Sequence, residues 1–209
     1  MKKISLSIAL LLISCKTVSY KDVNPIIKDN QKKLLLKNAI TNVYNIERIY
    51  DTSYTNFVVE GNTQRIKDAR IDDTKRLFFK WAEQMANYDP DGDYGYMVFR
   101  LNSVSDEKRL DVLEFFSIVL LGAPTLLGIP YSVKGYRIEG ELLIFDKNDR
   151  LVKRYIEDAY NSEYVAMYYG YTADDAKRKV ALDCIKEILE KIRVRVQKDY
   201  PILVKKLNK

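Results

Sequence analysis

The feature that most restricts the fold is a pair of strand-like runs followed by a long amphipathic helix. The runs YRIEGELLIFD (136–146) and LVKRYIED (151–158) are rich in residues that favour strands, and the polar turn KNDR separates them. This pattern predicts a β-hairpin. After Thr172 and Asp175, which resemble a capping box, apolar residues recur at helical spacing, so the helix has one face to bury. These residues are Val180, Ala181, Cys184, Ile185, Ile188, Leu189, Ile192 and Val196.

The rest of the chain supplies further helices and strands. Apolar residues at helical spacing predict helices over 27–43 and 74–88, whereas alternation of apolar and polar residues predicts a strand over 94–104. A further helix is expected over 105–121, because its first residue is a serine, a good N-cap, and Asp and Glu follow in its first turn. Tyr, Ile, Val and Thr are frequent over 44–61, which indicates an extended segment.

These elements predict an α+β fold. Strands and helices mix without repeated strand–helix–strand units, so we expect an antiparallel sheet with helices packed on one face and a long amphipathic helix closing the chain. No linker rich in Pro, Gly or Ser divides the 209 residues. We therefore expect a single domain over 24–209.

The first residues have the three parts of a secretory signal. Two lysines precede an apolar stretch (4–13), and the small residue Ser14 follows it. The stretch is about half of the roughly 20 apolar residues that a membrane-spanning helix needs. The sequence Leu12-Ile13-Ser14-Cys15 resembles the lipobox of bacterial lipoproteins, in which a cysteine is invariant.

The lipobox resemblance implies a location and an anchor. In bacterial lipoproteins the cysteine thiol takes a diacylglyceryl group, and cleavage makes the cysteine the new N-terminus. The resemblance thus implies a signal peptide over 1–14, lipidation of Cys15 and a tether over 15–23. Lys16 stands where an aspartate marks inner-membrane retention in many Gram-negative bacteria, which implies the outer membrane, at its periplasmic face or the cell surface. The order of elements over 100–196 also resembles uncharacterised small envelope lipoproteins, a likeness that supplies no catalytic residue.

Composition excludes several classes of function. The chain has no histidine, so histidine catalysis and histidine metal ligation are absent. Cys184 is the one cysteine besides Cys15, and it has no intramolecular partner if Cys15 carries lipid. The net charge of +6 is spread along the chain, which does not point to nucleic acid as a partner.

The most apolar part of the mature chain, FFSIVLLGAPTLLGIPY (115–131), has two interpretations. Buried core is favoured, because Gly and Pro interrupt the segment and any backbone they free would lack partners in lipid. A partner or membrane surface is the alternative. Six tyrosines between Tyr155 and Tyr171 are likewise expected mainly in the core, with an exposed binding row as the alternative. The residues nominated for a partner surface are Phe116, Leu120, Leu126, Leu127, Tyr164 and Tyr168.

Two acidic patterns are candidate sites. DPDGD (Asp89–Asp93) begins like a calcium loop, but Tyr94 replaces the required glycine and Arg100 the bidentate glutamate. A solvated turn without metal is therefore expected. Glu139 and Glu141 lie two apart in a strand, on one face and about 7 Å from each other. Two exposed strand residues are expected there rather than a catalytic pair.

The sequence therefore favours a lipid-anchored envelope lipoprotein that acts as a non-enzymatic interaction or accessory protein. It would meet the membrane through its lipid and an envelope protein through its surface. No cofactor, metal or catalytic residue is expected. The alternative is a lipid-anchored hydrolase that acts on an envelope polymer, for which Glu139 and Glu141 would be the acid/base candidates.

Overall fold

The fold is built around the predicted hairpin and the long helix that covers it. A computed structural model describes residues 14–19, 22–26, 31–41, 64–106, 130, 132–165 and 169–207. Its elements are β1 (Ser14–Lys16), β2 (Leu34–Leu36), β3 (Asn38–Thr41), α1 (Gln64–Met85), β4 (Ala86–Tyr88), β5 (Tyr96–Asp106), β6 (Ser132–Phe145), β7 (Leu151–Val165), β8 (Tyr169–Tyr171) and α4 (Ala173–Leu207).

Six of the strands form one sheet, in the order β1-β8-β7-β6-β5-β3. The three central strands β5, β6 and β7 are antiparallel, as predicted, whereas the outer strands β1, β8 and β3 are added in parallel. A second, two-stranded sheet pairs β2 with β4 in parallel. The predicted hairpin is confirmed and is longer than expected at its open end, because β6 begins at Ser132 and β7 ends at Val165.

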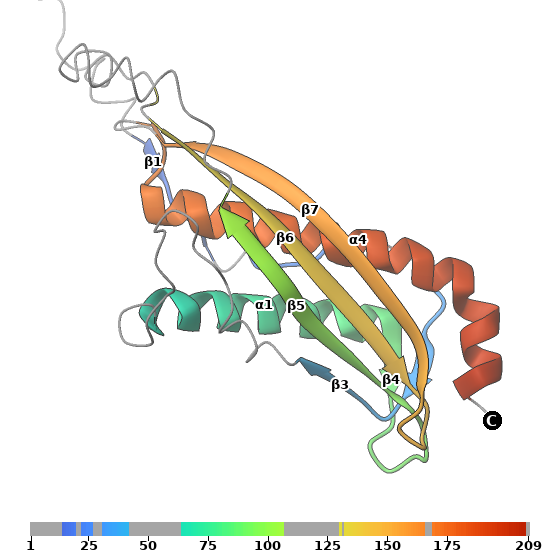
Figure 1. Cartoon of the computed structure of the whole chain (residues 1–209). Helices are drawn as coiled ribbons and strands as arrows, with labels where there is room; N and C mark the ends of the chain where they lie inside the picture. The colour runs from blue at the N-terminus through green and yellow to red at the C-terminus, as the bar shows by residue number, and fades with distance from the viewer. Residues whose placement is uncertain are drawn as a thin grey trace, which may run out of the picture.

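Helices α1 and α4 lie on the same face of the large sheet, and the core fills the space between these helices and the sheet (Figure 1). The Phe78 ring of α1 stacks on the Phe99 ring of β5, with 5.2 Å between centroids. Gly140 of β6 allows α4 to approach closely, because a Cβ there would lie 3.0 Å from Ile188 Cγ2. The α+β class, with helices on one face and a closing helix, is confirmed.

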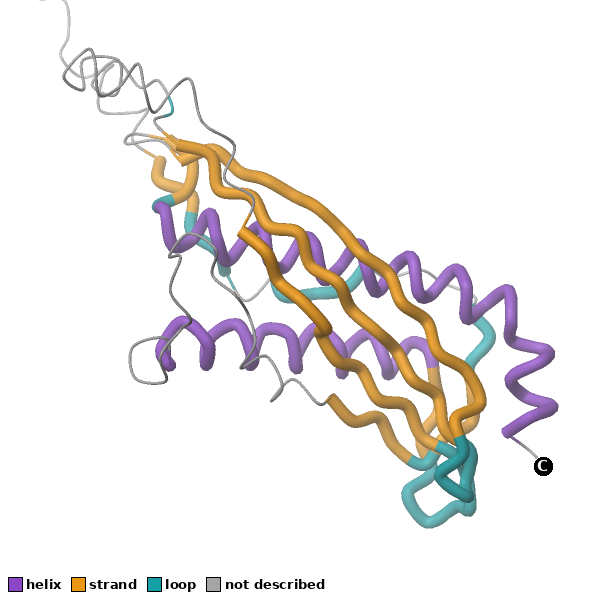
Figure 2. The backbone as a smooth tube through the Cα atoms, viewed as in Figure 1, coloured by secondary structure: helices purple, strands orange, loops and turns teal. Residues whose placement is uncertain are grey.

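The closing helix α4 has the predicted start and the predicted buried stripe. The Thr172 hydroxyl accepts a hydrogen bond from the Asp175 amide (3.2 Å) and donates one to its carboxylate (3.1 Å). All eight apolar residues of the predicted stripe are buried. The helix continues to Leu207 through Pro201, and Figure 2 shows it running along most of the length of the hairpin.

The expected helix over 27–43 is wrong, because its described part forms β2 and β3. Leu34 and Leu36 are buried and Leu35 between them is exposed, which is the alternation of a strand. Pairing of β2 with β4 and of β3 with β5 outweighs the local helical pattern. The expected extended segment 44–61 lies outside the described residues.

Two other boundaries also differ from the prediction. The helix expected over 74–88 begins at Gln64 and ends at Met85. Ser105 does not cap a helix: it belongs to β5, and its hydroxyl donates to the Arg137 carbonyl (3.4 Å). Pairing with β6 extends β5 to Asp106, and the rest of that predicted helix lies outside the described residues.

The segment predicted to be a tether packs against the domain where it is described. Val18 and Val23 are buried in the core, and Arg178 of α4 donates to the Val18 carbonyl (3.3 Å). Lys80 of α1 donates to the side chain of Asn24 (2.5 Å). The apolar valines explain the difference, because burying them stabilises the fold and leaves little free chain.

Candidate interaction surface on the open face of the sheet

One face of the central sheet points away from α1 and α4. Side chains alternate along strands, so the residues between those of the core face outward. No helix or strand of the described ranges covers this side, which we call the open face (Figure 1). It consists of Tyr96, Val98, Arg100, Asn102, Arg137, Glu139, Glu141, Leu143, Phe145, Arg154, Ile156, Asp158 and Tyr160, with Ile40 of β3 and Leu151 at its margin.

A buried carboxylate, that of Glu141, lies at the centre of the open face. Arg100 Nη2 lies 2.7 Å from its Oε1, and Arg154 Nη2 lies 2.8 Å from its Oε2. Asn102, placed by a bulge in β5, donates to Glu141 Oε2 (3.0 Å) and to Glu139 Oε1 (2.8 Å). The expectation of two exposed strand residues is therefore wrong for Glu141, because two arginines and an asparagine cover it.

These contacts fix the charge of Glu141. Burial raises the pKa of the Glu141 carboxyl, but hydrogen bonds from Arg154 and Asn102 and the charge of Arg100 outweigh burial and leave that pKa below its ordinary value. Glu141 is thus held as an ion-paired carboxylate. A group in this state is poorly suited to donate a proton, so the geometry does not favour the hydrolase alternative.

Apolar side chains gather on the half of the open face nearest the hairpin turn. The rings of Tyr96 and Phe145 stack with 5.0 Å between centroids. Leu151 lies opposite Phe145, Ile40 lies opposite Val98, and Ile156 lies further along β7, opposite Glu141; all three are exposed on this face. We call Tyr96, Phe145, Ile40, Leu151 and Ile156 the apolar patch. Exposed apolar groups gathered on one face and rimmed by arginines are typical of a protein-binding surface.

The outer edge of β7 is less suited to binding than the open face. Lys191 of α4 donates to the Asp158 carbonyl (2.7 Å), and Arg195 of α4 donates to the Ile156 carbonyl (3.4 Å). These basic side chains occupy carbonyls that an added strand would need. This edge of β7 is therefore obstructed to an added strand, whereas no such side chains block the open face in the described residues.

The Asp89–Asp93 segment forms a turn that ties its own carboxylates. Asp89 Oδ1 accepts a hydrogen bond from the Asp91 amide (3.3 Å), and Asp93 pairs with Lys147 of the hairpin turn (3.3 Å). Within the described ranges, no three Asp, Glu or Cys side chains are grouped as a metal site would require. The Asp93–Lys147 ion pair therefore links this turn to the hairpin turn at the same end of the sheet.

The nominated tyrosines and apolar residues are only partly within the described chain. Tyr155 is buried and donates to Asp199 Oδ2 of α4 (3.1 Å), whereas Tyr164 is 58% exposed. The tyrosine row is thus divided between core and surface. The other nominated residues, Phe116, Leu120, Leu126, Leu127 and Tyr168, lie outside the described residues.

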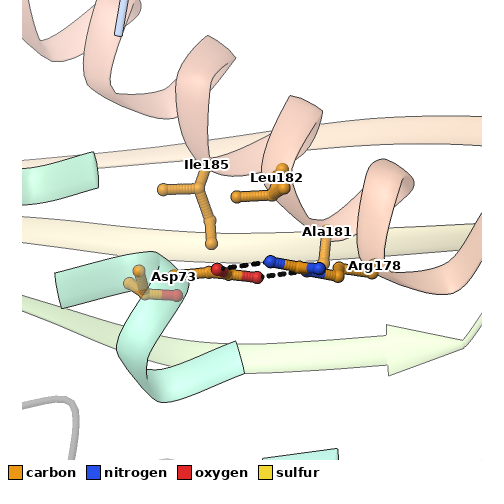
Figure 3. Close-up of a pocket in the computed structure, with 6 residues that line it drawn as sticks. Asp73, Arg178, Ala181, Leu182 and Ile185 are labelled. Carbon is orange, nitrogen blue, oxygen red and sulfur yellow. Dashed lines mark hydrogen bonds and ion pairs between the residues drawn. The ribbon is translucent and has the colours of Figure 1, made fainter. Parts of the chain in front are cut away.

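A small cavity lies between α1 and α4, beside an ion pair that the sequence pattern did not reveal (Figure 3). Its volume is about 10 Å³, room for one water molecule. Asp73, Thr74, Arg178, Ala181, Leu182 and Ile185 line it. Asp73 and Arg178 are 105 positions apart, so no local periodicity could have paired them. A cavity of this size has a structural role rather than a ligand.

No helix within the described ranges is both long and apolar enough to cross a bilayer. No family model matches this chain, and no curated protein matches it.

Solved structures do resemble the chain. A protein from Helicobacter pylori, assigned as a homolog of the neuraminyllactose-binding hemagglutinin, is 11% identical with a TM-score of 0.50 over 89% of this chain and 96% of its own. That likeness shows a shared fold. A DUF330-family protein from Xanthomonas campestris is 10% identical with a TM-score of 0.43, covering 83% of this chain and 93% of its own. A protein from Caulobacter crescentus CB15 assigned as a lipoprotein is 14% identical with a TM-score of 0.34, covering 68% and 85%.

Proposed function

We propose that this protein is a lipid-anchored lipoprotein of the bacterial envelope that binds a protein partner through the open face of its sheet. The observation that carries the binding role is the apolar patch beside the Arg100–Glu141–Arg154 cluster, a surface with no covering element in the described chain. The anchoring role rests on the lipobox that ends at Cys15.

The position of Cys15 in the fold supports its use as an anchor. It lies in β1, where its Cα is in register with that of Gly170 in β8. Cleavage before Cys15 would remove Ser14 and leave Cys15 and Lys16 at the end of the sheet. Two or three acyl chains would then hold the domain at the membrane, since each buried methylene contributes about 0.8 kcal/mol. Lys16 favours the outer membrane.

The chemistry of the open face suits a protein partner. The apolar patch would supply buried area, while the half-exposed guanidinium groups of Arg100 and Arg154 keep N–H donors for the partner's carboxylates or carbonyls. Because Glu141 fixes both guanidinium groups, little side-chain entropy would be lost on binding.

The apolar segment 115–131 is a second candidate surface. The connection that contains it leaves the sheet at Asp106 and returns at Ser132. Ser132 lies in register with Val165 of β7, and Val165 pairs with Tyr171 of β8, so this connection returns to the sheet in the same row as Lys16 of β1. Phe116, Leu120, Leu126 and Leu127 lie outside the described residues and stay proposed contacts for the membrane or a partner, with buried core as the interpretation that the sequence favours.

Lipidation is tested by labelling cells with radioactive palmitate. The wild-type protein is expected to carry the label and to sediment with membranes, whereas Cys15→Ser is expected to carry none. A wild-type protein that stays unlabelled and is cut at another residue would contradict the anchor.

Partner binding is tested by affinity purification of the lipidated protein from membranes, with mass spectrometry of what co-purifies. Leu151→Asp and Ile156→Asp place a charge in the apolar patch and are expected to lose the partner. Val194→Asp is the matched control, because Val194 is 54% exposed, close to the 52% of Leu151, but lies on α4. Circular dichroism checks that all three variants fold. Equal recovery of the partner with every variant would exclude the open face.

A further inference from the structure

The position of β1 in the sheet determines which end of the domain a lipid on Cys15 would hold at the membrane. Lys16 pairs with Tyr171, Tyr171 with Val165, and Val165 with Ser132, so these residues form one row across the sheet. We call the end of the sheet marked by this row the anchored end. The hairpin turn, residues 146–150, lies at the opposite end, which we call the tip (Figure 1).

The distance between the two ends follows from the length of β7. This strand has 15 residues and runs from Leu151 at the tip to Val165 at the anchored end. At roughly 3.3 Å per residue it spans about 46 Å. The long axis of the sheet therefore exceeds the thickness of a bilayer's hydrocarbon core, which is about 30 Å.

The chain between Cys15 and the core is short. Val18, three residues after Cys15, is buried, and its carbonyl accepts a hydrogen bond from Arg178. Three residues reach at most about 11 Å, so a lipid on Cys15 would hold the anchored end close to the headgroups. The described segment is therefore not a free tether of many residues. Such a tether would let the domain turn in any direction.

We infer that the domain stands upright on the bilayer, with the anchored end against the lipid headgroups and the tip directed away. This inference rests on the proposed lipidation of Cys15. The side chains exposed at the two ends of the sheet differ as this orientation requires. At the anchored end, Tyr164 is exposed and the Lys16 ammonium lies 6.0 Å from the centroid of the Tyr171 ring, residue types that suit the headgroup region. At the tip, the turns expose Asp91 and Asp149, whose carboxylates anionic headgroups repel, whereas the Asp93 carboxylate is paired with Lys147.

The upright orientation sets where a partner meets the protein. Leu151 and the Tyr96–Phe145 stack belong to the tip half of the open face, so the apolar patch would lie tens of ångströms from the headgroups. A partner that binds it must extend that far from the membrane or lie free of it.

The test compares two sites on β7 that differ in position but hardly in exposure. Tyr164 is 58% exposed near the anchored end, and Leu151 is 52% exposed at the tip. Tyr164→Cys and Leu151→Cys are made singly in the full-length, lipidated protein, labelled with a fluorophore and reconstituted in phosphatidylethanolamine/phosphatidylglycerol vesicles that carry a nitroxide on the headgroup. Unsubstituted protein is the labelling control, since Cys15 would be a thioether and Cys184 is buried.

Quenching by the headgroup nitroxide is expected to be several-fold stronger at position 164 than at position 151. Equal quenching at both positions would mean that the domain lies flat, and no quenching at either would mean that it is held away from the surface; both outcomes overturn the upright orientation. Co-sedimentation with vesicles is measured on the same samples. Loss of sedimentation would instead overturn the lipid anchor, and the orientation with it.

Discussion

The carboxylate of Asp73 in α1 accepts two hydrogen bonds from the guanidinium group of Arg178 in α4, from Nε to Oδ2 at 2.6 Å and from Nη2 to Oδ1 at 2.9 Å (Figure 3). Nη1 of the same guanidinium donates to the Val18 carbonyl at 3.3 Å. One side chain therefore fastens both helices and the segment that follows Cys15. This three-way contact keeps that segment against the domain.

Removal of the Asp73 carboxylate should destabilise the domain more than loss of a surface ion pair. Asp73 is buried and Arg178 is 30% exposed, so Asp73→Ala leaves a guanidinium that is only partly hydrated. We expect the free energy of unfolding to fall by about 2 kcal/mol. Urea unfolding followed by circular dichroism measures it.

Asp158→Ala is the matched control for the Asp73 variant. Asp158 pairs with Arg137, and both side chains are at least half exposed, so the loss is expected to stay within about 0.5 kcal/mol. Equal losses for the two variants would show that the Asp73–Arg178 pair adds nothing beyond an exposed contact.

Glu141 should make stability depend on pH in the acid range. Its folded pKa lies below the ordinary value of 4.5, so its contribution is present above pH 4.5 and is lost as the pH falls through the lower, folded pKa. Glu141→Gln cannot ionise. We expect the variant to lose about 1–3 kcal/mol at neutral pH and to show a shallower decline of stability below pH 4.5 than the wild type.

Unfolding by urea at a series of pH values tests this expectation. Glu139→Gln serves for comparison, because the Glu139 carboxylate has one hydrogen bond from Asn102 and is less buried. A Glu141→Gln protein whose stability follows the same pH curve as the wild type would rule out the ionised cluster.

The parts of the fold that the sequence predicted are those with a strong local signal. The hairpin has strand-forming arms around a polar turn, and α4 has a capping pair and a long buried stripe; both were found as expected. The segment around Leu35 was predicted wrongly, because three consecutive leucines fit either a helix or a strand and only pairing with β4 decides.

The candidate surface was harder to predict than the fold. Glu139 and Glu141 could be placed on one strand face, but Arg100 and Arg154 reach Glu141 from two other strands. Their convergence depends on strand order and register, which no single segment encodes. The Asp73–Arg178 pair joins two helices and spans 105 positions, so it too depends on tertiary packing. Burial of Val18 was missed because a single apolar residue in a polar stretch gives no periodicity.

The Cys184 thiol should be unreactive toward thiol reagents in the folded protein. Burial raises the pKa of its thiol to about 11, and the thiol donates to the Tyr136 carbonyl at 3.4 Å. We expect Ellman's reagent at pH 8 to react with Cys184 only as fast as the domain opens, and quickly in denaturant, because the reactive species is the thiolate. Immediate stoichiometric reaction of the native Cys15→Ser protein would show that the helix does not bury this thiol.

Two glycines of one loop should respond differently to a methyl group. A Cβ on Gly95 would lie 2.0 Å from the carbonyl oxygen of Phe145, a backbone atom fixed in the β5–β6 ladder. Gly95 itself accepts a hydrogen bond from the Lys37 amide (2.7 Å), so the loop cannot move away freely. Gly95→Ala is therefore expected to lower the free energy of unfolding by about 3 kcal/mol.

The comparison is Gly92→Ala, three positions earlier. A Cβ on Gly92 would meet the Tyr94 ring at 2.3 Å and the Asp89 carboxylate at 2.8 Å, both of which are side chains that can rotate toward solvent. The expected loss is therefore smaller, about 1 kcal/mol. Thermal and urea unfolding of the two variants measure the difference. A Gly95→Ala protein as stable as Gly92→Ala would mean that the loop does not hold Gly95 against the Phe145 carbonyl of β6.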